Sequence, residues 1–190
     1  MNILVRTAHP DLSSSTVNRK WFEALSDVDG ITTRDLMAVG GPEMRFNPLI
    51  EQTLLEQADR VVLQFPFYWY SSPPVLKAWL DKVLLFGFAY GQGGDKLQGK
   101  ELVLAISTGG PGESFQAGAF NSFTVSELLT PFRQTALLIG MTYLQPFVLH
   151  SAMSRDQTRL DASIPELISY LTSPQSDLKA KPARLNSASG

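Results

Sequence analysis

The sequence predicts an α/β fold built on a single doubly wound sheet of five parallel strands. Short apolar runs alternate along the chain with segments in which apolar residues recur at helical spacing. The runs are apolar at consecutive positions, which is typical of strands covered on both faces of a parallel sheet. Of the two common doubly wound strand orders, five strands favour the order 2-1-3-4-5.

Each expected strand is a short apolar run that is separated from the next run by a helical or loop segment. We expect the strands at residues 3–5, 31–36, 60–65, 102–106 and 142–149. Ligands of such sheets bind beyond the carboxyl ends of the strands, at the point where the strand order reverses. The loops that follow the first, third and fourth strands are therefore the expected site.

Two helices are predicted in the first third of the chain. Ser15 or Thr16 is a suitable N-cap for the first, whose apolar residues follow at helical spacing: Val17, Trp21, Ala24, Leu25 and Val28. Asn47 followed by Pro48 is a typical helix start. We expect the second helix to bury one face, which carries Ile50, Leu54 and Ala58.

Three more helices are predicted further along. Ser72-Pro73-Pro74 begins one, with Val75, Trp79 and Val83 on one side and Gly87 as its stop. Residues 124–139 form another, which Pro131 should kink or restart. The last helix is marked by apolar residues after the fifth strand, namely Ile164, Leu167, Ile168 and Leu171.

The composition fits one globular domain. The chain has 190 residues, of which 44% are hydrophobic and 18% charged. We expect the domain to cover residues 1–173 and residues 174–190 to form a polar, mobile tail. There is no cysteine, which excludes disulfides, thiol catalysis and zinc–thiolate sites. With only two histidines, His9 and His150, we expect no metal site.

The charge balance argues against nucleic acid as a partner. Sixteen lysines and arginines nearly balance eighteen acidic residues, for a net charge of −2, whereas nucleic-acid binding needs a basic surplus. The first ten residues do not resemble a signal peptide. Prolines and charges interrupt the apolar region 61–90, so it cannot present about 20 apolar residues to a bilayer. We expect a cytoplasmic protein.

The loop after the first strand, residues 8–18, has the properties of a phosphate site. It contains four consecutive hydroxyl residues, 13–16, and ends at a helix N-terminus, where free N–H groups and the helix dipole attract anions. An over-capped serine-rich turn is the alternative. The G-x-G-x-x-G pattern is absent, so a mononucleotide phosphate is a more natural ligand than a dinucleotide.

Four successive aromatic residues, 67–70, leave the third strand. Side chains of an extended segment alternate between its two sides, so at least two of the four should face the crevice, where they suit a flat conjugated ligand. An aromatic plug or an oligomer interface is the alternative. After the fourth strand, Gly109 and Gly110 allow a ligand close to the backbone. Residues 94–100 match a triphosphate-binding pattern, but Glu101 stands where it needs Ser or Thr.

Several stretches together resemble the flavodoxin-fold NAD(P)H quinone reductases. The similarity is greatest to their short bacterial branch, which includes general stress oxidoreductases and ancillary proteins of glutathione-gated potassium efflux systems. The matching stretches are residues 8–18, 64–83, 93–100, 107–115 and 129–151. The resemblance implies a flavodoxin-like fold and a flavin that is reduced by NAD(P)H and oxidised by a quinone in alternation, a ping-pong mechanism.

The resemblance also implies the residues that hold the flavin. Phosphate and ribityl contacts match His9, Ser15, Thr16, Val17 and Asn18. One edge and face of the isoalloxazine match Pro66, Phe67, Tyr68, Trp69 and Tyr70. The other edge matches Thr108, Gly109 and Gly110. The substrate pocket is expected to include Tyr70, Phe115 and Asn121.

No side chain is expected to act as a catalyst, because the flavin carries the chemistry. Mammalian-type members have a tyrosine and a histidine where this chain has Phe115 and, nearby, Asn121. We interpret His150 as a structural residue away from the switch point, and His9 as a possible donor to the phosphate. FMN is expected rather than FAD, because the chain lacks the long extension of larger members. The family resemblance further implies a homodimer whose two chains complete each site.

Three other functions remain open at this stage. The protein could be a flavoprotein regulatory subunit of a glutathione-gated potassium efflux system, bound to that membrane-associated partner. It could be an electron carrier similar to flavodoxins, although a net charge of −2 gives little field to steer a redox partner. It could also be a flavin-free interaction protein that keeps the fold.

Overall fold

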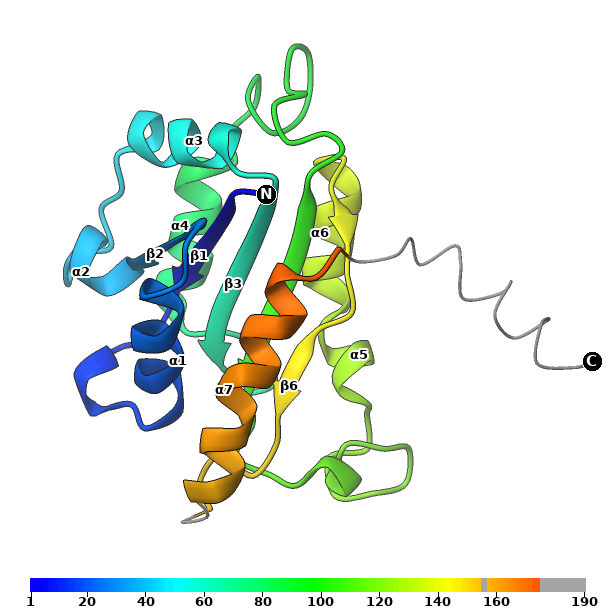
Figure 1. The fold of residues 1–190 in the computed structure, drawn as a ribbon. Helices are drawn as coiled ribbons and strands as arrows, with labels where there is room; N and C mark the ends of the chain where they lie inside the picture. The colour runs from blue at the N-terminus through cyan, green and yellow to red at the C-terminus, as the bar shows by residue number, and fades with distance from the viewer. Residues whose placement is uncertain (155–156, 175–190) are drawn as a thin grey trace, which may run out of the picture.

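The computed structural model describes residues 1–154 and 157–174 and has a central parallel sheet (Figure 1). The strands are Ile3–Thr7 (β1), Ile31–Asp35 (β2), Arg60–Pro66 (β3), Glu101–Ser107 (β4), Thr142–Tyr143 (β5) and Phe147–Leu149 (β6). Their order is β2-β1-β3-β4-β5, with β6 also paired to β4. The predicted fold class and strand order are confirmed.

The fifth predicted strand is divided into β5 and β6. The backbone N–H groups of Thr142 and Leu144 donate to the carbonyls of Lys100 and Leu102 at 2.8 and 2.9 Å. The next donor in this series would be residue 146, which is a proline and has no N–H. Pairing with β4 resumes at Phe147, opposite Ala105. One strand in the sequence is therefore two short strands in the sheet.

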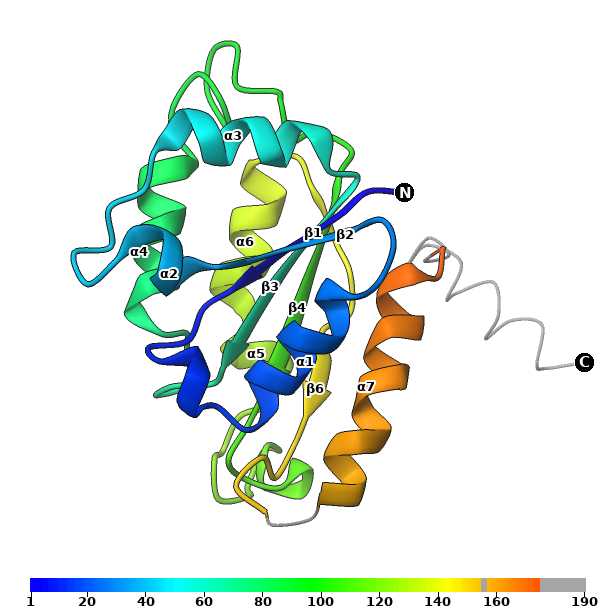
Figure 2. The same ribbon diagram turned by 60° about the vertical axis from the view of Figure 1, so that its left-hand side comes forward.

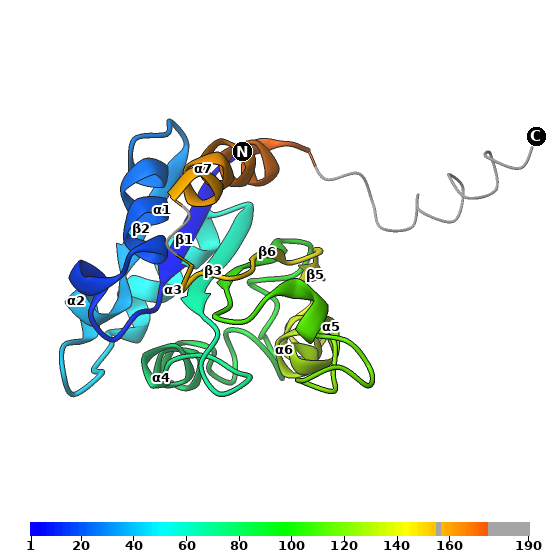
Figure 3. The same ribbon diagram turned by 90° about the horizontal axis from the view of Figure 1, so that it is seen from below.

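Helices cover both faces of the sheet, which gives three layers (Figures 2 and 3). The helices are Val17–Ser26 (α1), Leu36–Gly40 (α2), Pro48–Gln57 (α3), Pro74–Val83 (α4), Val125–Leu128 (α5), Thr130–Leu138 (α6) and Gln157–Thr172 (α7). On one face α1 and α7 bury Trp21 and Leu167 against the sheet. On the other, α3, α4 and α6 bury Leu55, Trp79 and Phe132.

Two helices differ from the sequence prediction. Helix α2 was not expected, since Leu36 was assigned to the second strand. Asp35 ends that strand instead and caps α2, because its Oδ1 accepts from the Met37 N–H at 2.9 Å. The helix expected over residues 124–139 is two helices, α5 and α6, that meet at Leu129, two residues before Pro131. The predicted restart at this proline is confirmed.

The apolar pattern predicted the buried face of α3 only in part: Ala58 is buried and Leu54 packs against the core, but Ile50 does not. Ile50 is 50% exposed, whereas Glu51 and Leu55 are buried. Glu51 is buried because it has cationic partners on the sheet. Its carboxylate oxygens lie 3.0 Å from Arg6 Nη2 and 3.3 Å from Arg34 Nη2, and Trp79 Nε1 donates to it at 2.8 Å. A charge network therefore determines how this helix is turned toward the sheet.

The Arg6 side chain is fully buried, and its guanidinium lies 5.7 Å from the centroid of the Trp79 ring. Burial lowers its pKa to about 10, although Glu51 acts in the opposite direction. Arg6 therefore stays charged near neutral pH, with Glu51 as its counter-ion.

A second buried arginine ties α7 to the amino end of the sheet. Arg60 Nε donates to Glu101 Oε2 at 2.6 Å. Arg60 Nη1 donates to the carbonyl of Leu171, in the last turn of α7, and to that of Ser173, just beyond the helix. Trp21 Nε1 joins α7 to α1 through Ser163 Oγ at 3.0 Å. The Arg60 side chain thus holds the C-terminal end of α7, and the Trp21 side chain holds its middle.

Within residues 1–154 and 157–174, no helix is long and apolar enough to cross a membrane. The tail expected over residues 174–190 lies, apart from Pro174, outside the described residues.

Glu51→Gln should destabilise the fold strongly, because it leaves the buried Arg6 guanidinium without a counter-ion. We expect the free energy of unfolding to fall by about 3–5 kcal/mol. Urea denaturation followed by circular dichroism measures this change. The control is Asp81→Asn, which breaks the exposed ion pair with Lys77 and should have little effect. A loss from Glu51→Gln no larger than that of the control would contradict the role of Glu51.

Candidate functional site

The loop after β1 is built by local hydrogen bonds that leave its outer donors available. It forms a short 3-10 helix, Leu12–Ser14, and Ser15 Oγ then accepts from the Asn18 N–H at 3.0 Å. Ser15 therefore caps α1, whereas the exposed Thr16 makes no capping bond. The first N–H groups of a helix have no acceptor within the helix. Thr16 and Val17 thus present a hydroxyl and a helix N-terminus at the surface of this loop.

His9 supports the same loop from beneath. Its Nδ1 accepts from the Asp11 N–H at 3.1 Å, so the neutral ring carries its proton on Nε2. Burial lowers the pKa of His9, while the neighbouring Asp11 and then Asp35 act in the opposite direction. The ring can therefore donate one hydrogen bond through Nε2 in its neutral form.

A buried polar brace holds the loops after β1, β3 and β4 together. Gln64 Nε2 donates to the Asn18 carbonyl at 2.8 Å, and Asn18 Nδ2 donates to Ser107 Oγ at 3.1 Å. Only 2% of Asn18 and none of Gln64 is exposed. The Asn18 side chain is thus committed to other loops. Sequence analysis did not single out Gln64, although a glutamine within an apolar strand was a signal that could have been used.

The aromatic loop turns sharply at two residues in the left-handed backbone region. Trp69 has φ 49° and Tyr70 φ 62°. They are the central residues of a two-residue turn in which Tyr68 and Ser71 exchange backbone hydrogen bonds of 3.1 and 2.9 Å. Such turns favour Asn-Gly, and bulky residues are strained there. The turn leaves Trp69 93% exposed.

The glycine loop presents its backbone to the same space. Among the residues that the structure describes, no acceptor is paired with the N–H groups of Gly109 and Gly110. A Cβ atom at Gly109 would lie 3.2 Å from Met153 Sδ, and one at Gly110 would lie 3.1 Å from Ser114 Oγ. Glycine at both positions therefore lets this loop pack closely against Met153 and Ser114 without a steric clash.

One cavity of about 720 Å³ lies between the aromatic and glycine loops. Ligand sites typically measure about 300–1,000 Å³, so its size suits a small molecule. Its lining combines predicted and unforeseen residues: Phe67, Trp69, Tyr70, Thr108, Gly109, Gly110, Pro111, Ser114, Phe115, Phe120, Asn121 and Met153. None of these has a charged side chain at neutral pH.

His150 lies against the glycine loop and not away from the switch point, as the sequence interpretation had it. Its Nδ1 is 2.8 Å from Thr108 Oγ1, and its ring centroid lies 5.6 Å from that of Phe115. Thr108 Oγ1 also donates to the Gly110 carbonyl at 3.0 Å. Because Thr108 has one hydroxyl proton, His150 Nδ1 acts as donor in this arrangement. Ser151 and Ala152 complete the contact, since their N–H groups donate to Gly110 and Thr108.

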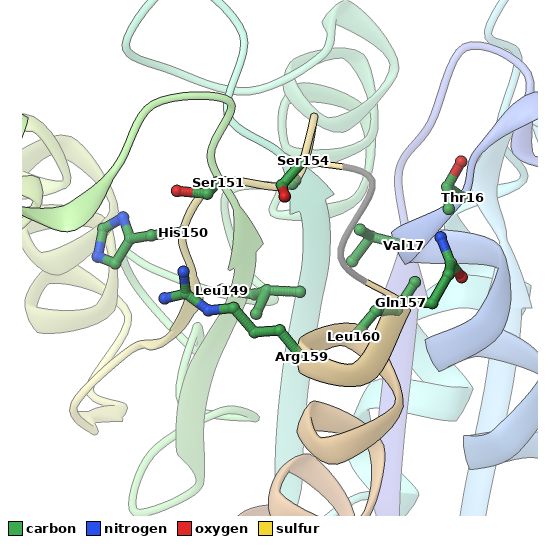
Figure 4. Close-up of a pocket in the computed structure, with 10 residues that line it drawn as sticks. Thr16, Val17, Leu149, His150, Ser151, Ser154, Gln157, Arg159 and Leu160 are labelled. Atoms are coloured by element: carbon green, nitrogen blue, oxygen red, sulfur yellow. The ribbon is translucent and has the colours of Figure 1, made fainter.

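A small second pocket lies between His150 and the loop after β1 (Figure 4). Its free space is about 20 Å³, little more than one water requires. Thr16, Val17 and Gln157 lie on one side, and His150 and Ser151 lie on the other. Burial lowers the pKa of His150, as does Arg159, whereas Glu113 raises it.

The predicted site residues are brought to one edge of the sheet but have different surroundings. Eight line the large cavity: Phe67, Trp69, Tyr70, Thr108, Gly109, Gly110, Phe115 and Asn121. Thr16 and Val17 line the small pocket. Neither pocket is lined by His9, Ser15, Asn18, Pro66 or Tyr68. Long-range folding placed Phe120 and Met153, which no local pattern marked, in the lining of the large cavity, and it placed His150 against the glycine loop.

The fold and site define the class of protein. It is a doubly wound α/β protein with an aromatic and glycine-lined crevice beside a phosphate-type loop, which suits a flat ligand that carries an anion. In the described part of the chain, no group of three or more His, Asp or Glu side chains could hold a metal ion.

Comparison with known proteins gives the family. The model of a family described as "Flavodoxin-like fold" matches residues 1–171, and the chain belongs to this family. It is 47% identical to general stress protein 14 of Bacillus subtilis (strain 168), over 92% of this chain and 99% of that protein. Identity is 42% with the NAD(P)H oxidoreductase YdeQ of the same organism, over 95% and 91% of the two chains. It is 40% with the potassium-efflux ancillary protein KefF of Klebsiella pneumoniae (strain 342), over 84% and 89%.

Solved structures show the same architecture. General stress protein 14 of Treponema denticola, in complex with FMN, is 36% identical over 90% of this chain and 98% of that chain, with a TM-score of 0.84. A chain described as a thermophilic tryptophan halogenase from Streptomycin violaceusniger is 44% identical over 90% and 99%, with a TM-score of 0.88. The name of the second structure implies a different activity from the names of the other relatives. It therefore does not identify a substrate for this chain.

Buried His9 and partly buried His150 should make the fold sensitive to acid. Their pKa values are lowered from 6.5 in the folded state, so the unfolded chain takes up protons first as the pH falls. We expect the free energy of unfolding to decrease between about pH 7.5 and about pH 5.5, and His150→Asn to reduce this decrease. Urea denaturation of both proteins at the two pH values measures it. Equal pH dependence in both would exclude a contribution from His150.

Proposed function

We propose that the protein is an FMN-dependent NAD(P)H oxidoreductase that reduces a quinone or a similar planar acceptor. A single cavity carries this proposal, because it joins an aromatic wall to two backbone N–H groups without a hydrogen-bond partner among the described residues. A loop with the donors of a phosphate site lies beside it. The FMN complex of a 36% identical relative supports FMN over FAD.

The residues present fit this cofactor at both of its ends. The helix N-terminus at Thr16 and Val17, with the His9 Nε2 proton, would hold the phosphate. The aromatic loop would hold one edge and face of the ring system, and the N–H groups of Gly109 and Gly110 would hold the other edge. Ser15 and Asn18 shape the phosphate loop rather than enter a cavity.

Bound FMN would supply two-electron transfer between NAD(P)H and an acceptor. The chain would contribute placement and fixed dipoles. The N–H groups of Gly109 and Gly110 would stabilise negative charge at the ring edge without reorganisation. Phe67, Trp69 and Tyr70 would orient planar ligands in the cavity. Because donor and acceptor would use the same cavity, they would do so in turn, in a ping-pong order.

A homodimer is part of this proposal. Trp69 is 93% and Phe120 91% exposed, and both line the cavity. Large exposed apolar groups that lie together often mark a partner surface. A second copy of the chain over this opening would bury both side chains and close the cavity toward solvent.

A second candidate function is regulation of a potassium efflux system. The 40% identity with a potassium-efflux ancillary protein favours it. In this case the flavin site is intact, but its output is binding to the membrane-associated partner. Co-purification with such a transporter, together with negligible turnover of quinones, would favour this function. Rapid turnover without any such association would exclude it as the main role.

The visible absorption spectrum of the purified protein tests the proposed function. We expect flavin absorption, either as purified or after addition of FMN, and bleaching when NADH or NADPH is added without oxygen. Subsequent addition of benzoquinone should restore the absorption. A protein that stays colourless after incubation with FMN would overturn the proposal.

Trp69→Ala should weaken FMN binding, because the side chain forms part of the cavity wall. Aromatic ring contacts contribute about 0.5–1.5 kcal/mol beyond burial, so we expect FMN to dissociate about 2–10-fold more readily. Fluorescence titration of the protein with FMN measures this. The matched control is Phe86→Ala, which removes another exposed aromatic side chain that does not line the cavity. Equal affinities of both variants would reject the role of Trp69.

A further inference from the structure

A chain of hydrogen bonds crosses the mouth of the large cavity and ends at Tyr70. Ser114 Oγ donates to the Pro111 carbonyl at 2.7 Å. Asn121 Nδ2 donates to Ser114 Oγ at 2.8 Å. Tyr70 Oη donates to Asn121 Oδ1 at 3.2 Å. The chain thus links the loop after β3 to the loop after β4, and all four residues line the cavity.

The direction of this chain follows from its first member. The Pro111 carbonyl can only accept, so it takes the single hydroxyl proton of Ser114. Ser114 Oγ must then accept from Asn121, which turns the amide nitrogen toward Ser114 and the amide oxygen toward Tyr70. Asn121 Oδ1 therefore takes the phenolic proton of Tyr70. The oxygen of Tyr70 is left with lone pairs for a ligand and without a proton to give.

The backbone of Tyr70 supports a role for this placement. Its φ of 62° belongs to the left-handed region, in which bulky residues are rare and strained. The position favours glycine, which would adopt this conformation without strain. The chain instead holds an aromatic ring with a polar end at the cavity, 46% exposed. Strained residues of this kind cluster at ligand sites.

We propose that Tyr70 is a specificity-determining residue for the hydride donor, and that its phenolic oxygen accepts a hydrogen bond from the carboxamide N–H₂ group of a nicotinamide in the cavity. This inference rests on the proposed function. The N–H₂ group of a nicotinamide carboxamide is a hydrogen-bond donor, and the free lone pairs of the Tyr70 oxygen can accept from it. The carbonyl oxygens of a quinone are acceptors only, so they gain no bond from Tyr70 while its proton is held by Asn121.

Asn121 is then a positioning residue, since it acts through Tyr70. Its removal would free the phenolic proton, and Tyr70 could then donate to a carbonyl as well as accept. The preference for a ligand with an N–H group should consequently decrease in Asn121→Leu, although Tyr70 itself is unchanged. This effect separates a directed hydrogen bond from simple packing against the tyrosine ring.

Equilibrium binding of oxidised dinucleotides to the FMN-loaded protein tests the inference without turnover. The probes are NAD⁺ and NADP⁺, each compared with its 3-acetylpyridine analogue, in which a methyl group replaces the amide nitrogen. Isothermal titration calorimetry gives the ratio of the two dissociation constants. We expect the natural dinucleotide to bind about 2–10-fold more tightly, as one hydrogen bond predicts.

Tyr70→Phe should bring this ratio close to one, and Asn121→Leu should lower it. Tyr143→Phe is the matched control, because Tyr143 lies in β5 and does not line the cavity, and it should keep the wild-type ratio. In steady-state assays, Tyr70→Phe should raise KM for NAD(P)H with little change in KM for benzoquinone.

A wild-type ratio near one, or an unchanged ratio in Tyr70→Phe, would overturn the inference. If the flavin is retained and bleached by NAD(P)H in that case, the proposed function still stands. A protein that binds no FMN overturns both.

Discussion

The buried hydrogen bonds from Gln64 to Asn18 and from Asn18 to Ser107 determine the geometry of the site. Each of the three residues belongs to a different βα unit: Gln64 and Ser107 lie near the carboxyl ends of β3 and β4, and Asn18 lies in the first turn of α1. A buried amide costs about 1–3 kcal/mol if it loses its partner, so the three loops are stable only in mutual register. The aromatic turn and the glycine loop can then face each other across one cavity. Loops are usually the variable part of a fold, and this brace makes three of them part of its core.

Local patterns in the sequence were sufficient for the sheet and for the position of the site. Buried parallel strands are continuously apolar, and the strand order fixes which loops meet, so residues 67–70 and 108–110 could be assigned to one crevice. Glu51 could not be placed in this way, because its burial depends on Arg6 and Arg34 from distant strands. The interruption of the fifth strand at Pro146 could have been predicted from the sequence, because proline has no N–H group to pair with the neighbouring strand.

The contacts of His150, Asn121 and Met153 depend on two segments that fold over the glycine loop. One is the long loop between β4 and α5, and the other is the chain that follows β6. These segments have no hydrophobic periodicity, and their positions arise from individual bonds such as that between His150 and Thr108. The cavity that results has no charged side chain at neutral pH among its lining residues. Its selectivity must therefore come from shape, ring faces and a few directed hydrogen bonds, and not from net electrostatic attraction.

The hydrogen bonds from Arg60 to the end of α7 have a practical consequence for modification of this protein. Arg60 is the first residue of β3, so Ser173 is held beside the amino ends of the strands, whereas the crevice lies at their carboxyl ends. A fluorescent reporter, an affinity tag or a surface tether attached directly after Ser173 would therefore lie at the end of the molecule opposite the crevice. Immobilised in that orientation, the protein would keep its point of attachment away from the crevice, which suits biosensor formats and screens for ligands.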